Sequence, residues 1–83
     1  MLVINGAYGE GGGQIVRTAL TLSAMLTQPV RLENIRAGRK NPGLAAQHLT
    51  AVKAAAMICE AQVSGATLGS TQLTFEPQSS PIA

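Results

Sequence analysis

Aromatic side chains are scarce in this sequence, which has no tryptophan and only Tyr8 and Phe75 as aromatic residues. Proteins that bind single-stranded nucleic acid by stacking present several aromatic side chains to the bases. The composition therefore disfavours a small stand-alone RNA-binding module. That alternative stays open. Comparing the binding of RNA with and without a 3′-phosphate would separate it from a phosphate-specific protein.

Cysteine and long apolar runs are scarce as well. The single cysteine, Cys59, excludes an internal disulfide and fits an intracellular setting. It lies in an alanine-rich helical stretch, where we expect a buried structural thiol rather than a nucleophile. Residues 1–5 are followed at once by glycine, so no signal peptide is predicted, and no run approaches the roughly 20 apolar residues of a membrane span. We expect a cytoplasmic protein without a membrane contact.

Charged residues make up 12% of the chain, against 46% hydrophobic residues. So few charges suit a piece of something larger, because little is left to coat an independent surface. Four of the six basic residues lie within ten positions, and these are Arg31, Arg36, Arg39 and Lys40. Such a cluster indicates either a phosphate or nucleic-acid contact or a solvated loop.

The spacing of apolar residues predicts six elements in the order β-α-β-α-β-β. A buried strand is expected at 1–5, a helix at 14–27, a half-exposed strand at 30–35, a second helix at 44–60, and short strands at 61–65 and 71–75. The expected apolar stripes are Ile15, Ala19, Leu22 and Leu26 on the first helix and Leu49, Val52, Ala56 and Cys59 on the second.

This order predicts an α+β fold, in which two helices pack on one face of a four-stranded mixed sheet. Such a sheet has open edges and one uncovered face, which favour self-association. Residues 78–83 have no periodic pattern and are expected to be frayed.

A glycine-rich segment at 9–14, Gly-Glu-Gly-Gly-Gly-Gln, leads directly into the first predicted helix. Glycines let the backbone approach a ligand, and a helix start offers free N–H groups with a partial positive charge. The segment therefore predicts a phosphate cradle, with a strained turn that binds nothing as the alternative. It lacks the Lys-Ser/Thr pair of a Walker motif, and Gln14 replaces the third glycine of the dinucleotide fingerprint.

Polar residues around this segment are candidates for the same site. Gln14 and Arg17 lie three positions apart on one helix face. A cation near a helix start is electrostatically unfavourable, so Arg17 indicates an outside anion or an acid elsewhere in the fold. Glu10 suits a divalent cation that carries a nucleotide, or is a solvated loop carboxylate. Arg36 and Arg39 are separated by Ala-Gly and can converge on one anion.

Two polar residues of the second helix differ in their expected roles. Gln47 points away from the apolar stripe and is free to contact a ligand. His48 is the single histidine and borders that stripe, where a structural role is expected more often than a catalytic one.

Five segments together resemble the RNA 3′-terminal phosphate cyclase family, in order and at that family's spacing across residues 5–77. They are GEGGGQIVRT at 9–18, IRAGR at 35–39, PGL at 42–44, QHLTA at 47–51 and LGSTQLTF at 68–75. One local departure is Ala46, where family members often carry a larger polar or basic residue.

The resemblance implies an enzyme that converts an RNA 3′-phosphate into a 2′,3′-cyclic phosphate with ATP and a divalent metal, Mg²⁺ or Mn²⁺. A histidine is adenylylated first, AMP passes to the RNA 3′-phosphate, and the neighbouring 2′-hydroxyl displaces it. ATP and an RNA 3′-phosphate end are thus the expected partners. The implied fold has three β-α-β-α-β-β repeats, of which residues 1–77 would be the first and 78–83 a frayed or truncated tail.

The resemblance also assigns roles to residues. Glu10 would hold the metal, and the ATP and RNA-phosphate site would be lined by Gln14, Arg17, Arg36, Arg39 and Gln47. No catalytic residue is expected in this chain, because the family's nucleophilic histidine lies near the carboxyl end of a much longer protein.

That histidine is therefore expected beyond Ala83, the last residue of the sequence. For this reason we expect the chain alone to be inactive. A non-catalytic relative that acts in ribosome assembly is disfavoured, since Glu10 and the arginines are intact.

Overall fold

The structure, a computed structural model, describes residues 1–6, 12–38 and 40–78. Its elements follow the predicted order, with boundaries that differ from the prediction by a few residues. They are β1 (Leu2–Asn5), α1 (Gly12–Leu26), β2 (Val30–Glu33), α2 (Ala46–Cys59), β3 (Gln62–Ser64) and β4 (Leu73–Glu76). Residues 79–83, most of the tail predicted to fray, lie outside the described residues.

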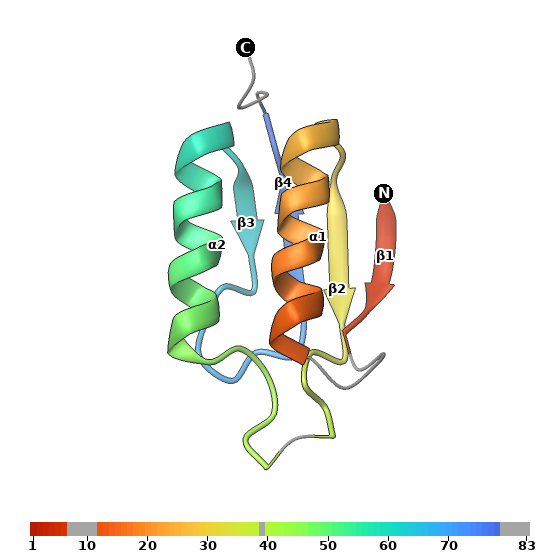
Figure 1. Ribbon diagram of the computed structural model, residues 1–83, viewed down its shortest axis with the longest axis vertical. Helices are drawn as coiled ribbons and strands as arrows, with labels where there is room; N and C mark the ends of the chain where they lie inside the picture. Colours follow the sequence, from red (N-terminus) through yellow and green to blue (C-terminus); the bar gives the residue numbers. More distant parts are fainter. Residues whose placement is uncertain (7–11, 39, 79–83) are drawn as a thin grey trace.

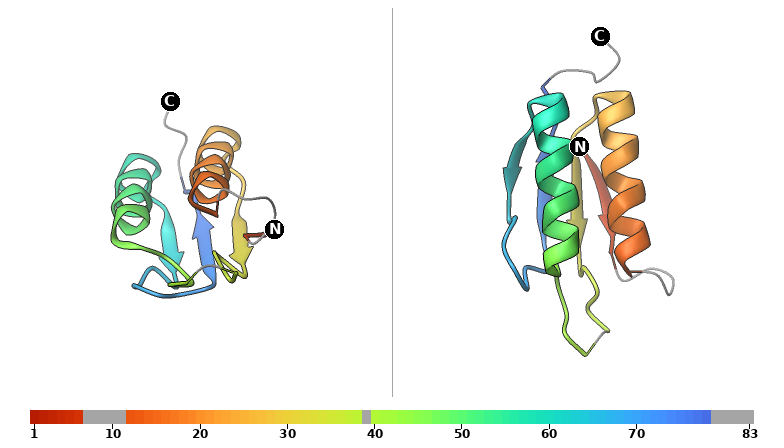
Figure 2. Two further views of the ribbon diagram at one scale, coloured as in Figure 1. Left: turned by 60° about the horizontal axis from the view of Figure 1, so that its bottom comes forward. Right: turned by 60° about the vertical axis from the view of Figure 1, so that its left-hand side comes forward.

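The four strands form one mixed sheet in the order β1-β2-β4-β3. β1 pairs with β2 in parallel, whereas β4 pairs antiparallel with both β2 and β3. Both helices cover the same face of this sheet (Figures 1 and 2). The predicted α+β fold is therefore confirmed. Within the described ranges, no helix has the length and apolar character needed to cross a membrane.

The core lies between the helices and the sheet. β2 alternates as predicted, with Val30 and Leu32 buried and Arg31 exposed. β4 also alternates, so that Leu73 and Phe75 face the helices. The buried apolar residues are Val16, Ala19, Leu20, Val30, Leu32, Ile35, Leu44, Val52, Cys59, Leu73 and Phe75.

The apolar stripe predicted for α1 is largely wrong. Of its members only Ala19 is buried, and Leu22 and Leu26 are exposed. The face that packs on the sheet is formed by Val16, Ala19, Leu20 and Ser23. Apolar residues occupy more than one face of α1, so spacing alone could not choose between two stripes. The polar residue Ser23 also made the buried stripe harder to recognise. Its hydroxyl donates to the Gln28 carbonyl, so the hydroxyl has a hydrogen-bond partner inside the fold.

The prediction of a buried strand at the amino end is also wrong. β1 is an edge strand, and Leu2 and Val3 are each about half exposed. It pairs with β2 on one side only. A short apolar run is compatible with either a central or an edge strand, so local spacing could not separate the two.

Candidate functional site

Both helices begin at the same end of the molecule, where β1 and β2 end (Figure 1). The loop between β2 and α2 lies at this end too, because β2 runs toward it. The first two turns of α1, the first turn of α2 and this loop contribute four of the predicted site residues, Gln14, Arg17, Arg36 and Gln47. The fold thus gathers candidates that are far apart in the sequence.

The loop between β2 and α2 is fixed by contacts with the loop between β3 and β4. The Leu44 N–H donates to the Ser70 carbonyl, and the Gly69 N–H donates to the Leu44 carbonyl, both at 2.9 Å. Gly43 has φ +87°, and a Cβ there would lie 2.2 Å from the Gly69 carbonyl oxygen. This close approach requires glycine at position 43, and it holds the loop against its neighbour.

Arg36 is half-buried in this loop and has a left-handed backbone, with φ 50°. Its Nη1 donates to the Gly43 carbonyl at 2.9 Å. A guanidinium carries five N–H donors, so this bond leaves others for an anion. Arg36 therefore fixes the shape of its own loop, a role that the sequence analysis did not identify.

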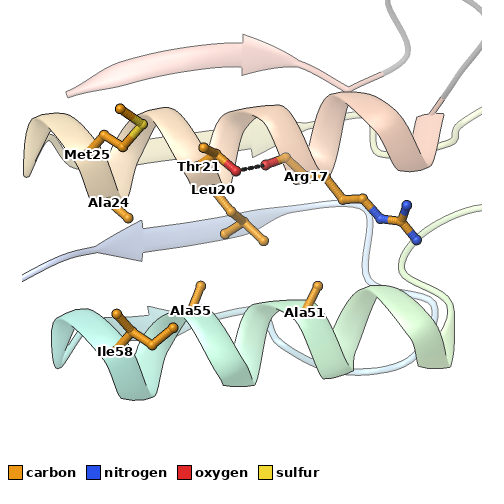
Figure 3. A pocket seen from close by; sticks show the side chains of 8 residues that line it. All are labelled: Arg17, Leu20, Thr21, Ala24, Met25, Ala51, Ala55 and Ile58. Atoms are coloured by element: carbon orange, nitrogen blue, oxygen red, sulfur yellow. Dashed lines mark hydrogen bonds between the residues drawn. The ribbon is translucent and has the colours of Figure 1, made fainter. Parts of the chain in front are cut away.

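Arg17 is exposed on α1, and its side chain extends toward the end where both helices begin (Figure 3). Gln14 and Gln47 are exposed in the first turns of α1 and α2. Burial, and then the charges of Arg36 and Arg17, lower the pKa of His48. Arg36 is bonded to the Gly43 carbonyl just before α2, and Arg17 extends toward the same end of the molecule.

Three of the sequence-based assignments fall outside the described residues. Glu10 and Arg39, assigned to the metal and to a phosphate, are not among them, and neither is Ala83, beyond which the nucleophilic histidine is expected. Among the residues that the structure describes, no group of three His, Cys, Asp or Glu side chains could hold a metal ion. The metal site and the place of the nucleophile therefore stay predictions.

His48 is buried, with 3% of its surface exposed. Its Nδ1 accepts a hydrogen bond from the Ala45 N–H at 3.1 Å. Ala45 is the residue before α2 and has no side-chain acceptor of its own, so the imidazole satisfies a backbone donor at the helix start. Burial first, and then the charges of Arg36 and Arg17, lower the pKa of His48. This geometry agrees with a structural histidine held neutral.

The neutral state of His48 predicts a pH dependence of stability. The unfolded chain protonates histidine near pH 6.5, whereas the folded state resists protonation. The free energy of unfolding should therefore be highest above pH 6.5 and fall as the pH drops from about 6.5 to 5, by at most about 1.4 kcal/mol per pH unit. Urea titrations at several pH values would measure this slope.

His48→Gln is the matched control for this prediction, because an amide can accept the same hydrogen bond without titrating. His48 is the single histidine of the chain, and carboxylates titrate mostly below this window. The variant should have a nearly flat stability curve between pH 5 and 6.5. A slope that survives the substitution would contradict the role given to His48.

Comparison with known proteins identifies the family. The description of the matching family, over residues 8–82, is RNA 3′-terminal phosphate cyclase. The chain is 65% identical over 77 residues to the RNA 3′-terminal phosphate cyclase of Methylococcus capsulatus, which covers 93% of this chain and 21% of that protein. It is 61% identical over 75 residues to the protein of the same name from Pyrobaculum aerophilum, covering 90% of this chain and 22% of that protein.

A third relative, the RNA 3′-terminal phosphate cyclase of Trichormus variabilis, is 60% identical over 77 residues, again 93% of this chain and 22% of the relative. The chain thus spans about one fifth of the length of these relatives. The match covers α1, the loop after β2 and the start of α2, where the candidate residues lie. The chain belongs to the RNA 3′-terminal phosphate cyclase family.

Proposed function

We propose that this chain is the amino-terminal part of an ATP-dependent RNA 3′-terminal phosphate cyclase, and that its helix-start end binds phosphate groups of ATP and of the RNA end. One observation carries the proposal: Arg36, bonded to the Gly43 carbonyl in the loop before α2, and Arg17, which extends from α1, lie at the same end of the fold although they come from different elements. Within the described part of the chain, neither arginine forms an ion pair with an acidic side chain. Two cations without an acidic partner among the described residues favour an external anion.

The chemistry of the surrounding groups fits a phosphate. A guanidinium binds phosphate through two parallel N–H bonds, and the free N–H groups of a helix start add partial positive charge. Gln14 and Gln47 add amide donors in the first turns of the two helices. Arg39 would extend the same site from the loop that Arg36 fixes.

The proposed metal rests on Glu10, the single ligand that the sequence analysis assigns to it. A hard divalent cation such as Mg²⁺ prefers carboxylate oxygens together with phosphates of the substrate. We therefore propose that Glu10 is one ligand of the metal, whose other ligands come from the nucleotide phosphates and from the rest of the enzyme.

The proposed reaction closes an RNA 3′-phosphate into a 2′,3′-cyclic phosphate. A histidine nitrogen attacks the α-phosphate of ATP and displaces pyrophosphate, and the AMP then passes from the histidine to the RNA 3′-phosphate. The neighbouring 2′-hydroxyl loses its proton as its oxygen attacks the 3′-phosphate, and AMP leaves. Such transfers need the anions held on several sides with the nucleophile in line.

This chain contributes one side of that arrangement. His48 is poorly suited as nucleophile, because it is buried with Nδ1 engaged. We therefore propose that the adenylylated histidine lies beyond Ala83, and that the chain alone binds phosphates without transferring AMP.

A labelling experiment tests the second half of this proposal. The purified chain is incubated with ATP labelled at the α-phosphate and with Mg²⁺ or Mn²⁺, and acid-sensitive adenylylated protein is measured. No labelling is expected while circular dichroism shows intact helices. Labelling that disappears in His48→Ala would contradict the proposal and make His48 the nucleophile.

A binding experiment tests the first half. At low salt the chain should bind a short RNA with a 3′-phosphate more tightly than the same RNA with a 3′-hydroxyl. Arg17→Ala should weaken that binding about tenfold, the size expected for one lost charge-assisted contact. Arg31→Ala is the matched control, since Arg31 is exposed on β2 between two residues that are buried under the helices. Equal affinity for both RNA ends would favour a general RNA-binding module instead.

A further inference from the structure

The proposed phosphate site takes no residue from the loop between β3 and β4, residues 65–72, although part of the segment at 68–75 that resembles the cyclase family lies there. This loop lies at the end of the molecule where both helices begin (Figure 1). It contains no charged residue, so it adds no charge to a site for an anion. It does contact the loop between β2 and α2, residues 34–45, which we call the site loop.

The site loop is hydrogen-bonded to the β3–β4 loop near both of its ends. Near its start, the Ile35 N–H donates to the Thr71 carbonyl at 3.0 Å. Near its end, the Leu44 N–H donates to the Ser70 carbonyl, and the Leu44 carbonyl accepts from the Gly69 N–H, both at 2.9 Å. The β3–β4 loop therefore sets the positions of the two ends of the site loop.

These bonds hold both partners of the contact between Arg36 and Gly43. Arg36 directly follows Ile35, and Gly43 directly precedes Leu44. The Gly43 N–H also donates to the Ile35 carbonyl at 2.9 Å, which joins the two ends of the site loop to each other. The Arg36 side chain completes this arrangement through the bond from Nη1 to the Gly43 carbonyl. The backbone at both ends of that bond is thus held from outside the site loop.

The β3–β4 loop has internal hydrogen bonds that keep its own shape. The Ser70 hydroxyl donates to the Gln72 carbonyl at 2.7 Å, and the Ser70 N–H donates to the Thr67 carbonyl at 3.1 Å. At the base of the loop Gly65 has φ +84°, and a Cβ there would lie 2.4 Å from the Gln72 carbonyl oxygen. Ser70 therefore links these internal bonds to the site loop, because its carbonyl accepts from Leu44.

We propose that Ser70 is a positioning residue of the phosphate site, which holds the β3–β4 loop in the shape that sets the Arg36 guanidinium in place for the anion. One N–H of Arg36 is bonded to the Gly43 carbonyl, and the other donors of a guanidinium held in this way can bind a phosphate with less loss of side-chain freedom. This inference rests on the proposed phosphate site.

Binding of a short RNA with a 3′-phosphate tests the positioning role. Ser70→Ala removes the hydroxyl and should weaken binding about fivefold, the size expected for one lost neutral hydrogen bond. In a chain that already carries Arg36→Ala, the same substitution should change binding by less than about twofold, because the residue through which Ser70 acts is gone. Ser70→Thr keeps the hydroxyl and should restore most of the affinity.

Thr67→Ala is the matched control, since it changes an exposed side chain of the same loop and should alter binding by less than about twofold. Salt separates support from direct contact. Arg36→Ala should reduce the salt dependence of binding because it removes a charge, whereas Ser70→Ala should leave that dependence unchanged. Equal effects of Ser70→Ala with and without Arg36 would overturn the proposal, as would equal effects of Ser70→Ala and Thr67→Ala.

Nuclear magnetic resonance of the Arg36 side chain gives a readout that does not need RNA, with its signals assigned by their loss in Arg36→Lys. At low temperature, separate signals for the two Nη groups are expected in the unchanged chain, because the bond to the Gly43 carbonyl slows rotation of the guanidinium. Ser70→Ala should merge these signals while circular dichroism shows intact helices.

Separate Nη signals that persist in Ser70→Ala would overturn the proposal, as would merged signals in the unchanged chain or a loss of helices in Ser70→Ala. Signals that merge only in Ser70→Ala, in a chain that does not bind the RNA, would support the action of Ser70 on Arg36. That combination would contradict the proposed phosphate site instead, so the two failures are distinguishable.

Discussion

Gly43→Ala is expected to lower the free energy of unfolding by about 3 kcal/mol or more. The added Cβ would lie 2.2 Å from the Gly69 carbonyl oxygen and 2.3 Å from its carbon, and both are backbone atoms that cannot rotate away. The left-handed backbone of Gly43, at φ +87°, adds strain for any residue with a side chain. A domain of this size has a total stability of only about 4–12 kcal/mol, so this loss would remove about a quarter of it or more.

Gly69→Ala separates the steric part of this effect from the backbone part. Gly69 also has a left-handed backbone, at φ +79°, but a Cβ there would meet no atom within 4 Å. Gly69→Ala should therefore lower the free energy of unfolding by only about 1 kcal/mol. Urea unfolding followed by far-ultraviolet circular dichroism measures both variants. Equal losses would show that the contact between the two loops does not hold the site loop in place.

Phe75→Ala is expected to cost about 3–5 kcal/mol. Phe75 is fully buried on β4, where it is paired with Val30 on one side and Val63 on the other. Removing its ring would leave a cavity between the sheet and the helices that the surrounding strands cannot close. The same urea titrations measure the loss.

Two further variants serve as controls for this prediction. Phe75→Leu keeps most of the buried volume and should cost about 1 kcal/mol. Thr74→Ala changes the adjacent residue, which points to the open face of the sheet, and should cost about 0.5 kcal/mol or less. A loss in Thr74→Ala as large as that in Phe75→Ala would mean that the core does not lie where the structure places it.

Much of the fold was predictable because its strands and helices differ in period. β2 alternates between Val30 and Leu32 on one face and Arg31 on the other, so its half-buried character could be read directly. α1 was harder, because apolar residues lie on several of its faces and the sheet selects one of them. The exposure of β1 depends on the order of strands in the sheet, which local spacing does not contain.

The candidate site was predictable as a set of residue types and less so as an arrangement. Arg17, Arg36 and Gln47 were identified from charge, loop composition and helix position, and the fold brings their elements to one end. The bond from Arg36 to the Gly43 carbonyl depends on a left-handed residue and on a contact between two loops, which no local pattern reveals. The role of His48 at the helix start could have been predicted from the sequence. Ala45, before the helix, has no side chain that could cap it, so another side chain had to accept a hydrogen bond there.

The strand order has a consequence for how the chain acquires its structure. The central pair of the sheet joins β2 to β4, and α2 and β3 lie between them in the sequence. The long segment between β2 and β4 must close before the two strands can pair and gain their stabilising contacts, so this step should limit the folding rate. During synthesis from the amino end, β1, α1 and β2 are complete while half of their sheet is still missing. Phe75 is therefore among the last residues of the sheet to be synthesised, and the core cannot reach its native packing before Phe75 has been added to the chain.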